Sequence, residues 1–165
     1  MIQEIKIKNF LSFKDEVCFS FEATNDKFAE ESQVVTINEN TRLLRFAIIY
    51  GYNASGKSNL LRALDFLLYF WSFKPKDLDS GTGVIPFKLD KTSADVPSCF
   101  EMVFFVRDTK YCYQLELDQY QVYLEKLSCF YPKVRITKFI PTSLLSQPKK
   151  RISCKTDFYM QLRLG

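Results

Sequence analysis

The chain has 165 residues, of which 47% are hydrophobic and 25% charged, and its formal net charge is +4. These values are ordinary for a globular protein with its own core, and they exclude a disordered chain. The apolar stretches are broken by charges, which argues against a membrane-spanning segment, and the amino end lacks the apolar region of a signal peptide. The sequence contains no histidine, which excludes a Cys/His zinc site.

Two strands are predicted at the amino end. Residues 2–8 alternate loosely between polar and apolar side chains, which indicates a strand with one wet face. A turn region at residues 12–15 joins it to a second strand at residues 16–22. Residues 23–41 are polar and predict a loop that encloses a short strand at residues 33–37.

An apolar run and a helix follow. Residues 46–50 form the short, β-rich apolar stretch that is typical of a buried parallel strand. A helix is predicted from residue 56 or 57 to about residue 73, where Lys74 and Pro75 end it. This helix is apolar nearly all round, so we expect it to be covered on both sides.

Between that run and that helix lies a glycine-rich loop with the pattern G-x-x-x-x-G-K-[ST]. It reads Gly51, Tyr52, Asn53, Ala54, Ser55, Gly56, Lys57 and Ser58, and Asn59 follows. The two glycines allow backbone N–H groups to turn toward phosphate oxygens at the positive end of the helix. Lys57 can reach the β- and γ-phosphates and the Ser58 hydroxyl can ligate Mg²⁺. The loop therefore predicts a site for a nucleoside triphosphate, which we take to be ATP, and for Mg²⁺.

The remainder of the chain is rich in strands. Residues 77–97 predict a long connection with one short strand at residues 85–88. Alternating segments separated by breaks of hairpin length then predict an antiparallel meander of three or four strands, at residues 99–107, 111–117, 121–131 and 134–140. We expect residues 1–140 to form one nucleotide-binding lobe, with the meander at 99–140, and residues 141–165 to form a basic tail. The five cysteines are expected to be reduced and mostly buried.

Three features together resemble a known family: the segment from Ile5 to Asp15, the glycine-rich loop and the meander. They are similar to the amino-terminal part of ABC-type ATPases of the RecF/SMC-like class, and most closely to the stand-alone bacterial AAA-family ATPases related to the OLD-family proteins. The likeness covers roughly residues 1–140. It implies an α/β P-loop NTPase fold with an antiparallel β-meander arm, the front half of an ABC-type ATPase head.

The resemblance also implies a mechanism and neighbours for the nucleotide. ATP would clamp two heads together, so the expected partner is a second copy of the chain or a second ATPase half. Lys8, Asn9, Ser12 and Phe13, which follow the first strand, would lie near the nucleotide. By analogy, the family suggests a role in phage defence or DNA maintenance.

The chain departs from this family in its hydrolytic motifs. A Walker B strand needs about four apolar residues ending in an aspartate that holds Mg²⁺. The nearest match, at residues 113–118, alternates between polar and apolar side chains and belongs to the predicted meander. No signature motif of the LSGG type is present. We therefore expect an ATP-binding lobe without assignable catalytic residues, and a carboxyl-terminal tail cut off from a second half.

Two other functions stay open at this point. One is a small P-loop kinase, although the predicted β-hairpins are poor in the arginines that a kinase lid needs. The other is a non-hydrolysing interaction module that responds to ATP. The basic residues Lys149, Lys150 and Arg151 leave contact with DNA open. Composition predicts a cytoplasmic protein without a membrane partner.

Overall fold

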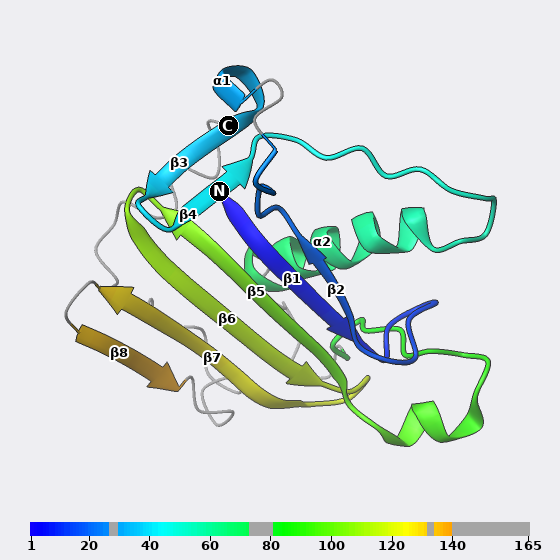
Figure 1. Ribbon diagram of the computed structural model, residues 1–165. Helices are drawn as coiled ribbons and strands as arrows, with labels where there is room; N and C mark the ends of the chain where they lie inside the picture. Colours follow the sequence, from blue (N-terminus) through cyan, green and yellow to red (C-terminus); the bar gives the residue numbers. More distant parts are fainter. Residues whose placement is uncertain (27–29, 73–80, 132–133, 140–165) are drawn as a thin grey trace.

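The computed structural model describes residues 1–26, 30–72, 81–131 and 134–139 (Figure 1). Its main body is a six-stranded sheet in the order β2-β1-β5-β6-β7-β8, in which all neighbours are antiparallel. The strands are β1 (Ile2–Lys8), β2 (Val17–Ser20), β5 (Ser98–Val106), β6 (Thr109–Leu117), β7 (Val122–Tyr131) and β8 (Val134–Phe139). The predicted meander is therefore confirmed, as are the two amino-terminal strands.

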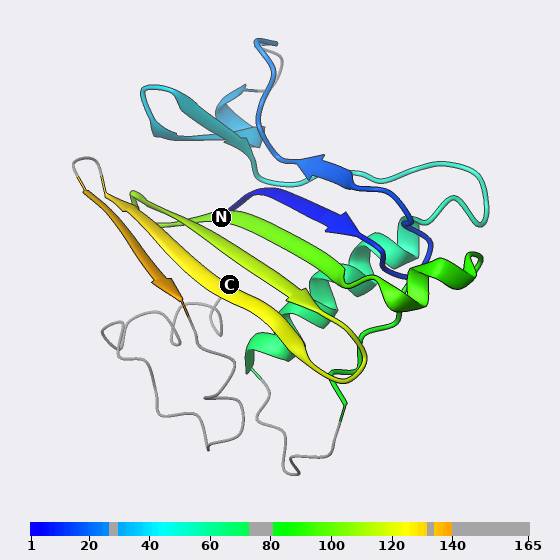
Figure 2. The ribbon, with the colours of Figure 1, turned by 90° about the horizontal axis from the view of Figure 1, so that it is seen from below.

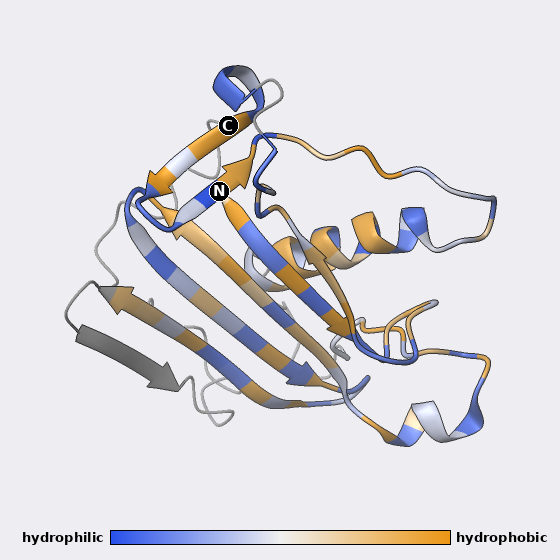
Figure 3. Ribbon diagram, viewed as in Figure 1, coloured by the Kyte–Doolittle hydropathy of each residue, from blue (hydrophilic) through white to orange (hydrophobic). Residues whose placement is uncertain are grey.

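Alternation along the strands separates an inner face from an outer face. In β1, Ile5 and Ile7 are buried, whereas Lys6 between them is partly exposed. A similar alternation of hydropathy runs along β6 in Figure 3, whereas the second half of β5, residues 102–106, is apolar throughout. Helix α2 (Lys57–Ser72), close to the predicted bounds, lies along the inner face (Figure 2). The core therefore sits between one helix and one face of the sheet.

Aromatic contacts fix α2 on the sheet. The ring centroids of Phe66 and Phe100 are 5.2 Å apart, and those of Trp71 and Tyr113 are 4.8 Å apart in a stacked pair. On the opposite side of the helix, Leu61 is 59% exposed. Within the described residues, then, α2 is covered by the sheet alone and not on both sides. None of the helices in this part of the chain is long and apolar enough to cross a membrane.

A buried polar pair lies in this core. The Tyr113 hydroxyl donates to Glu125 Oε1 at 2.9 Å, and both residues are buried. Burial and the neighbouring carboxylate raise the pKa of Tyr113.

Replacing Tyr113 by phenylalanine should therefore destabilise the fold. The Tyr113→Phe variant keeps the ring but removes the donor from a buried carboxylate, which costs about 1–3 kcal/mol. Urea denaturation at neutral pH measures the loss. The matched control is Tyr123→Phe, because the Tyr123 hydroxyl donates to Asp118 Oδ2 at 2.6 Å on the surface. An equal loss of stability in both variants would contradict the interpretation.

The predicted parallel strand at residues 46–50 is wrong. This run is extended but belongs to no sheet, and Ile48 and Tyr50 are 78% and 90% exposed. A strand needs a hydrogen-bonded neighbour, and no described strand runs beside this one. The prediction rested on apolar composition alone, whereas a strand forms only where another strand can hydrogen-bond with it.

Two other local predictions need correction. The strand expected near residues 33–37 is β3 (Val34–Asn38), but it pairs with an unpredicted β4 (Thr41–Leu44) and follows a short helix, α1 (Glu30–Gln33). The strand expected at residues 85–88 is absent. Pro86 has no N–H to donate, and the Phe87 N–H donates to a side chain instead of a strand. The 3-10 helix η1 (Lys91–Asp95) follows.

The cysteines are less buried than predicted. All four in the described residues are free thiols: Cys18 is exposed, and Cys99, Cys112 and Cys129 are partly exposed. Cys99, for example, lies between the buried residues Ser98 and Phe100, so its side chain points to the opposite face of β5. Alternation along the strand therefore sets its exposure. Cys154 and the predicted tail at 141–165 lie outside the described residues.

Candidate functional site

The glycine-rich loop, residues 51–58, connects the extended run to α2. Three of its residues have a positive φ that side chains rarely adopt: Gly51 with φ of 155°, Ala54 with φ of 63° and Gly56 with φ of 90°. A Cβ at Gly56 would lie 3.1 Å from Ser12 Oγ, and one at Gly51 would lie 3.2 Å from Ser55 Oγ. The loop is therefore tightly wound, and the positive φ of both glycines would strain any side chain placed there.

The loop leaves most of its backbone donors unpaired. Ser55 N–H donates to Tyr52 O at 3.3 Å, and Asn59 N–H donates to Gly56 O at 2.9 Å, where α2 begins. Within the described part of the chain, the other seven N–H groups of residues 51–58 have no acceptor, those of Gly51, Tyr52, Asn53, Ala54, Gly56, Lys57 and Ser58. Orphan donors at the positive end of a 16-residue helix form a site suited to an anion.

Lys57 adds a positive charge to this loop. Its Nζ donates to Gly51 O at 2.9 Å, to Tyr52 O at 2.6 Å and to Ser55 Oγ at 3.4 Å. These contacts hold the ammonium group on the loop instead of extending it into solvent. Ser58, the predicted Mg²⁺ ligand, is exposed at the first turn of α2. Together, the unpaired N–H groups, the Lys57 ammonium group and the Ser58 hydroxyl suit a phosphate group with its metal ion.

A tight turn after β1 packs against the loop. Phe10 N–H donates to Phe13 O at 2.9 Å and Phe13 N–H donates back to Phe10 O at 2.8 Å, so Leu11 and Ser12 form the tip. Leu11 has φ of 50°, an angle that a branched side chain rarely adopts. The Ser12 hydroxyl and the Phe13 ring face Gly56. The structure thus brings two of the residues predicted beside the nucleotide to the glycine-rich loop.

The other two residues from this segment behave differently. Asn9 is 3% exposed, and the polar atoms of its side chain bond to the backbone of residues 87–96. Lys8 is exposed at the end of β1, where it pairs with Cys99. The geometry therefore gives Asn9 a role within the protein, and direct contact of either residue with a nucleotide stays a prediction.

The carboxylates considered as a Walker B equivalent lie in the meander. Asp118 accepts from Tyr120 N–H and Gln121 N–H, both at 2.7 Å, and caps the turn between β6 and β7. A hydrogen bond from the Tyr123 hydroxyl, together with these two, lowers the pKa of Asp118 below its ordinary value. Glu116 lies within β6. Both positions are explained by the sheet, as the alternation of residues 113–118 indicated.

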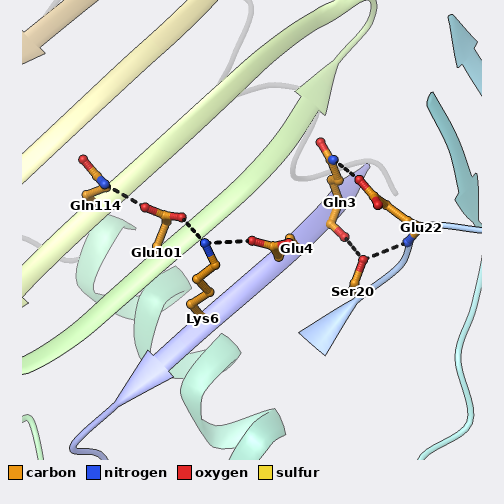
Figure 4. A network of polar contacts seen from close by, with 7 residues as sticks. All are labelled: Gln3, Glu4, Lys6, Ser20, Glu22, Glu101 and Gln114. Atoms are coloured by element: carbon orange, nitrogen blue, oxygen red, sulfur yellow. Dashed lines mark hydrogen bonds and ion pairs between the residues drawn. The ribbon is translucent and has the colours of Figure 1, made fainter. Parts of the chain in front are cut away.

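A shallow hollow of about 180 Å³ lies on the outer face of the sheet. Its polar centre is Lys6, which contacts Glu101 Oε1 at 3.0 Å and Glu4 Oε1 at 3.2 Å, while Gln114 donates to Glu101 at 2.7 Å (Figure 4). The hydrogen bonds that Lys6 donates to Glu101 and Glu4 raise the pKa of Lys6. The hollow is lined by Lys6, Glu16, Cys99, Phe100, Glu101, Gln114 and Glu116. Lys6 and Glu101 are paired with each other, and none of the lining residues belongs to the glycine-rich loop.

Comparison with known proteins identifies one match. The model of a family described as "AAA domain, putative AbiEii toxin, Type IV TA system" matches residues 46–163. The match begins at the extended run before the glycine-rich loop and covers more than two thirds of the 165 residues. No curated protein matches the chain significantly.

Proposed function

Because the chain belongs to this family of AAA domains, a class of nucleotide-binding P-loop ATPases, we propose that it is the ATP-binding lobe of an ABC-type ATPase. The observation that carries this proposal is the glycine-rich loop, in which seven unpaired N–H groups and the Lys57 ammonium group lie just before and at the start of α2. An anion of high charge density is the ligand that such a site stabilises.

Each residue of the loop has a role in the proposed site. The unpaired N–H groups of residues 53, 54 and 56–58 donate to phosphate oxygens, and Gly51 and Gly56 allow the close backbone approach. Lys57 neutralises the β- and γ-phosphates, and Asn59 continues the helix that orients the loop. Mg²⁺ bound at Ser58 would neutralise further phosphate charge. Ser12 and Phe13 lie beside Gly56 and border the same site.

Binding is the part of the ATPase reaction that the described residues supply. Phosphoryl transfer to water also needs a group that orients the attacking water and a carboxylate that holds Mg²⁺. Asp118, the nearest candidate in the sequence, is engaged by two N–H groups and a hydroxyl in its own turn. That engagement also favours the second candidate function, an interaction module that responds to ATP without hydrolysing it.

Titration calorimetry with Mg-ATP tests the proposal. We expect the wild type to bind with 1:1 stoichiometry, and Lys57→Ala to weaken binding by about 10- to 100-fold, the loss of a hydrogen-bonded charge worth about 1.5–3 kcal/mol. The matched control is Arg107→Ala, which removes an exposed positive charge in the turn between β5 and β6. Absence of heat with folded wild-type protein, or equal weakening in both variants, would overturn the proposal.

A further inference from the structure

Asn9 lies at the junction between β1 and the turn that faces the glycine-rich loop. Its backbone has φ of 52°, an angle that asparagine tolerates better than most residues. Its side chain is buried and points away from solvent into the segment that precedes β5. We call residues 84–97 the brace, because they run alongside this turn and contact it repeatedly.

The Asn9 side chain binds the brace at three points. Its Nδ2 donates to Ser93 O at 2.8 Å and to Val96 O at 2.6 Å, and its Oδ1 accepts from Phe87 N–H at 3.1 Å. The two donors and the acceptor of the amide are thus all in use, and the partners are backbone atoms spread over ten residues. An aspartate would lack the donors, and a serine would lack both reach and one donor.

Two further contacts join the brace to the same turn. Leu11 N–H donates to Ile85 O at 3.0 Å, and Lys14 Nζ lies 2.7 Å from Asp90 Oδ2. The hydrogen bond from Lys14 holds the pKa of the Asp90 carboxyl at about 2, so this pair is charged at neutral pH. Asp90 also accepts from Thr92 N–H at 3.0 Å and caps η1.

On the other side, the turn touches the glycine-rich loop. Ser12 and Phe13 follow Asn9 by three and four residues and face Gly56. Gly56 immediately precedes Lys57. Gly56 is held at φ of 90° in a loop with few hydrogen bonds of its own among the described residues. The loop has few internal hydrogen bonds, and the turn at residues 10–13 supports it. The brace, in turn, holds this turn in position.

We propose that Asn9 is a positioning residue for phosphate binding: it fixes the turn at residues 10–13 against Gly56 and so keeps the glycine-rich loop in its binding conformation. This inference rests on the proposed function. Without the amide of Asn9, the turn and the loop populate other conformations. The apparent affinity then equals the intrinsic affinity multiplied by the fraction of molecules whose loop is in the binding conformation.

The Asn9→Gly variant tests the inference, because glycine permits the positive φ of this position and lacks the amide side chain. We expect Mg-ATP to bind about tenfold more weakly in calorimetry, corresponding to a loop that is competent in about a tenth of the molecules. Amide hydrogen exchange should accelerate in residues 51–58 while exchange in β6 stays at the wild-type rate. Unchanged affinity, with wild type binding normally, would overturn the inference.

A control separates positioning from general loss of stability. Tyr113→Phe destabilises the core at the pair with Glu125 and touches neither turn nor loop. We expect it to lower the melting temperature and to leave the affinity for Mg-ATP unchanged at 15 °C, a temperature chosen to keep both variants folded. If both variants weaken binding equally, Asn9 acts only through global stability and the proposal fails.

A second variant keeps the test decisive if Asn9→Gly does not fold. Asp90→Ala removes the exposed pair with Lys14 and the cap of η1, and so loosens the brace from its outer side. Loss of such a cap should weaken binding about threefold. Wild-type affinity in Asp90→Ala would then overturn the inference. Absence of Mg-ATP binding in the wild type would instead refute the proposed function itself.

Discussion

Replacing Gly56 by valine is expected to remove nearly all affinity for Mg-ATP while leaving the sheet folded. Gly56 has φ of 90°, and a Cβ there would lie 3.1 Å from Ser12 Oγ and 3.4 Å from the Phe13 ring. A β-branched residue is strained at this angle by about 1–3 kcal/mol, even before the contact with Ser12 is counted. The loop must change its conformation, and its N–H groups then no longer converge on one phosphate.

We expect at least about 30-fold weaker binding, which corresponds to roughly 2 kcal/mol. Calorimetry with Mg-ATP measures the affinity, and circular dichroism confirms that the strands persist. Gly83→Val is the matched control, since Gly83 also has a positive φ, of 75°, but nothing lies within 4 Å of a Cβ built there. Wild-type affinity in Gly56→Val would contradict the proposed role of the loop.

The second large effect concerns the helix that carries the site. Leu67 is 1% exposed in the core between α2 and the sheet, whereas Leu61 on the same helix is 59% exposed. Leu67→Ala removes buried methyl groups and leaves a cavity, at a cost of about 2–5 kcal/mol. Leu61→Ala should change the free energy of unfolding by no more than about 0.5 kcal/mol.

Chemical denaturation of both variants measures the difference directly. The comparison holds residue type, helix and substitution constant, so only burial differs. It also examines the outer face of α2, which the sequence predicted to be covered. If Leu61→Ala costs as much as Leu67→Ala, that face is covered in the folded protein by something outside the described residues.

The sequence predicted the meander well because its signals are local. Alternation in β5 and β6 and breaks of hairpin length determine both the face and the partner of each strand. The glycine-rich loop could also be predicted from the sequence, because its pattern of residues indicates where donors suited to a phosphate group lie. Helix α2 followed from an apolar run without glycine or proline, ended near a Lys-Pro pair.

Residues that depend on distant partners could not be predicted. A run such as residues 46–50 has the composition of a buried strand, but composition does not supply a neighbouring strand. Asn9 was placed beside the nucleotide by family resemblance, while its side chain binds carbonyl groups 84 and 87 residues further along the chain. No local pattern encodes those contacts. The brace is irregular, so neither a period of two nor one of 3.6 marks it.

The exposed run before the glycine-rich loop has a consequence for how the protein behaves at high concentration. Its five residues combine β-branched and aromatic side chains with no charge and no proline, and their backbone pairs with no described strand. Such a window is the type that adds strands from other molecules and nucleates aggregation. Arg45 is the single charged residue that directly flanks it, in the position of a gatekeeper. The residues that lead into the glycine-rich loop therefore also form an exposed, aggregation-prone window.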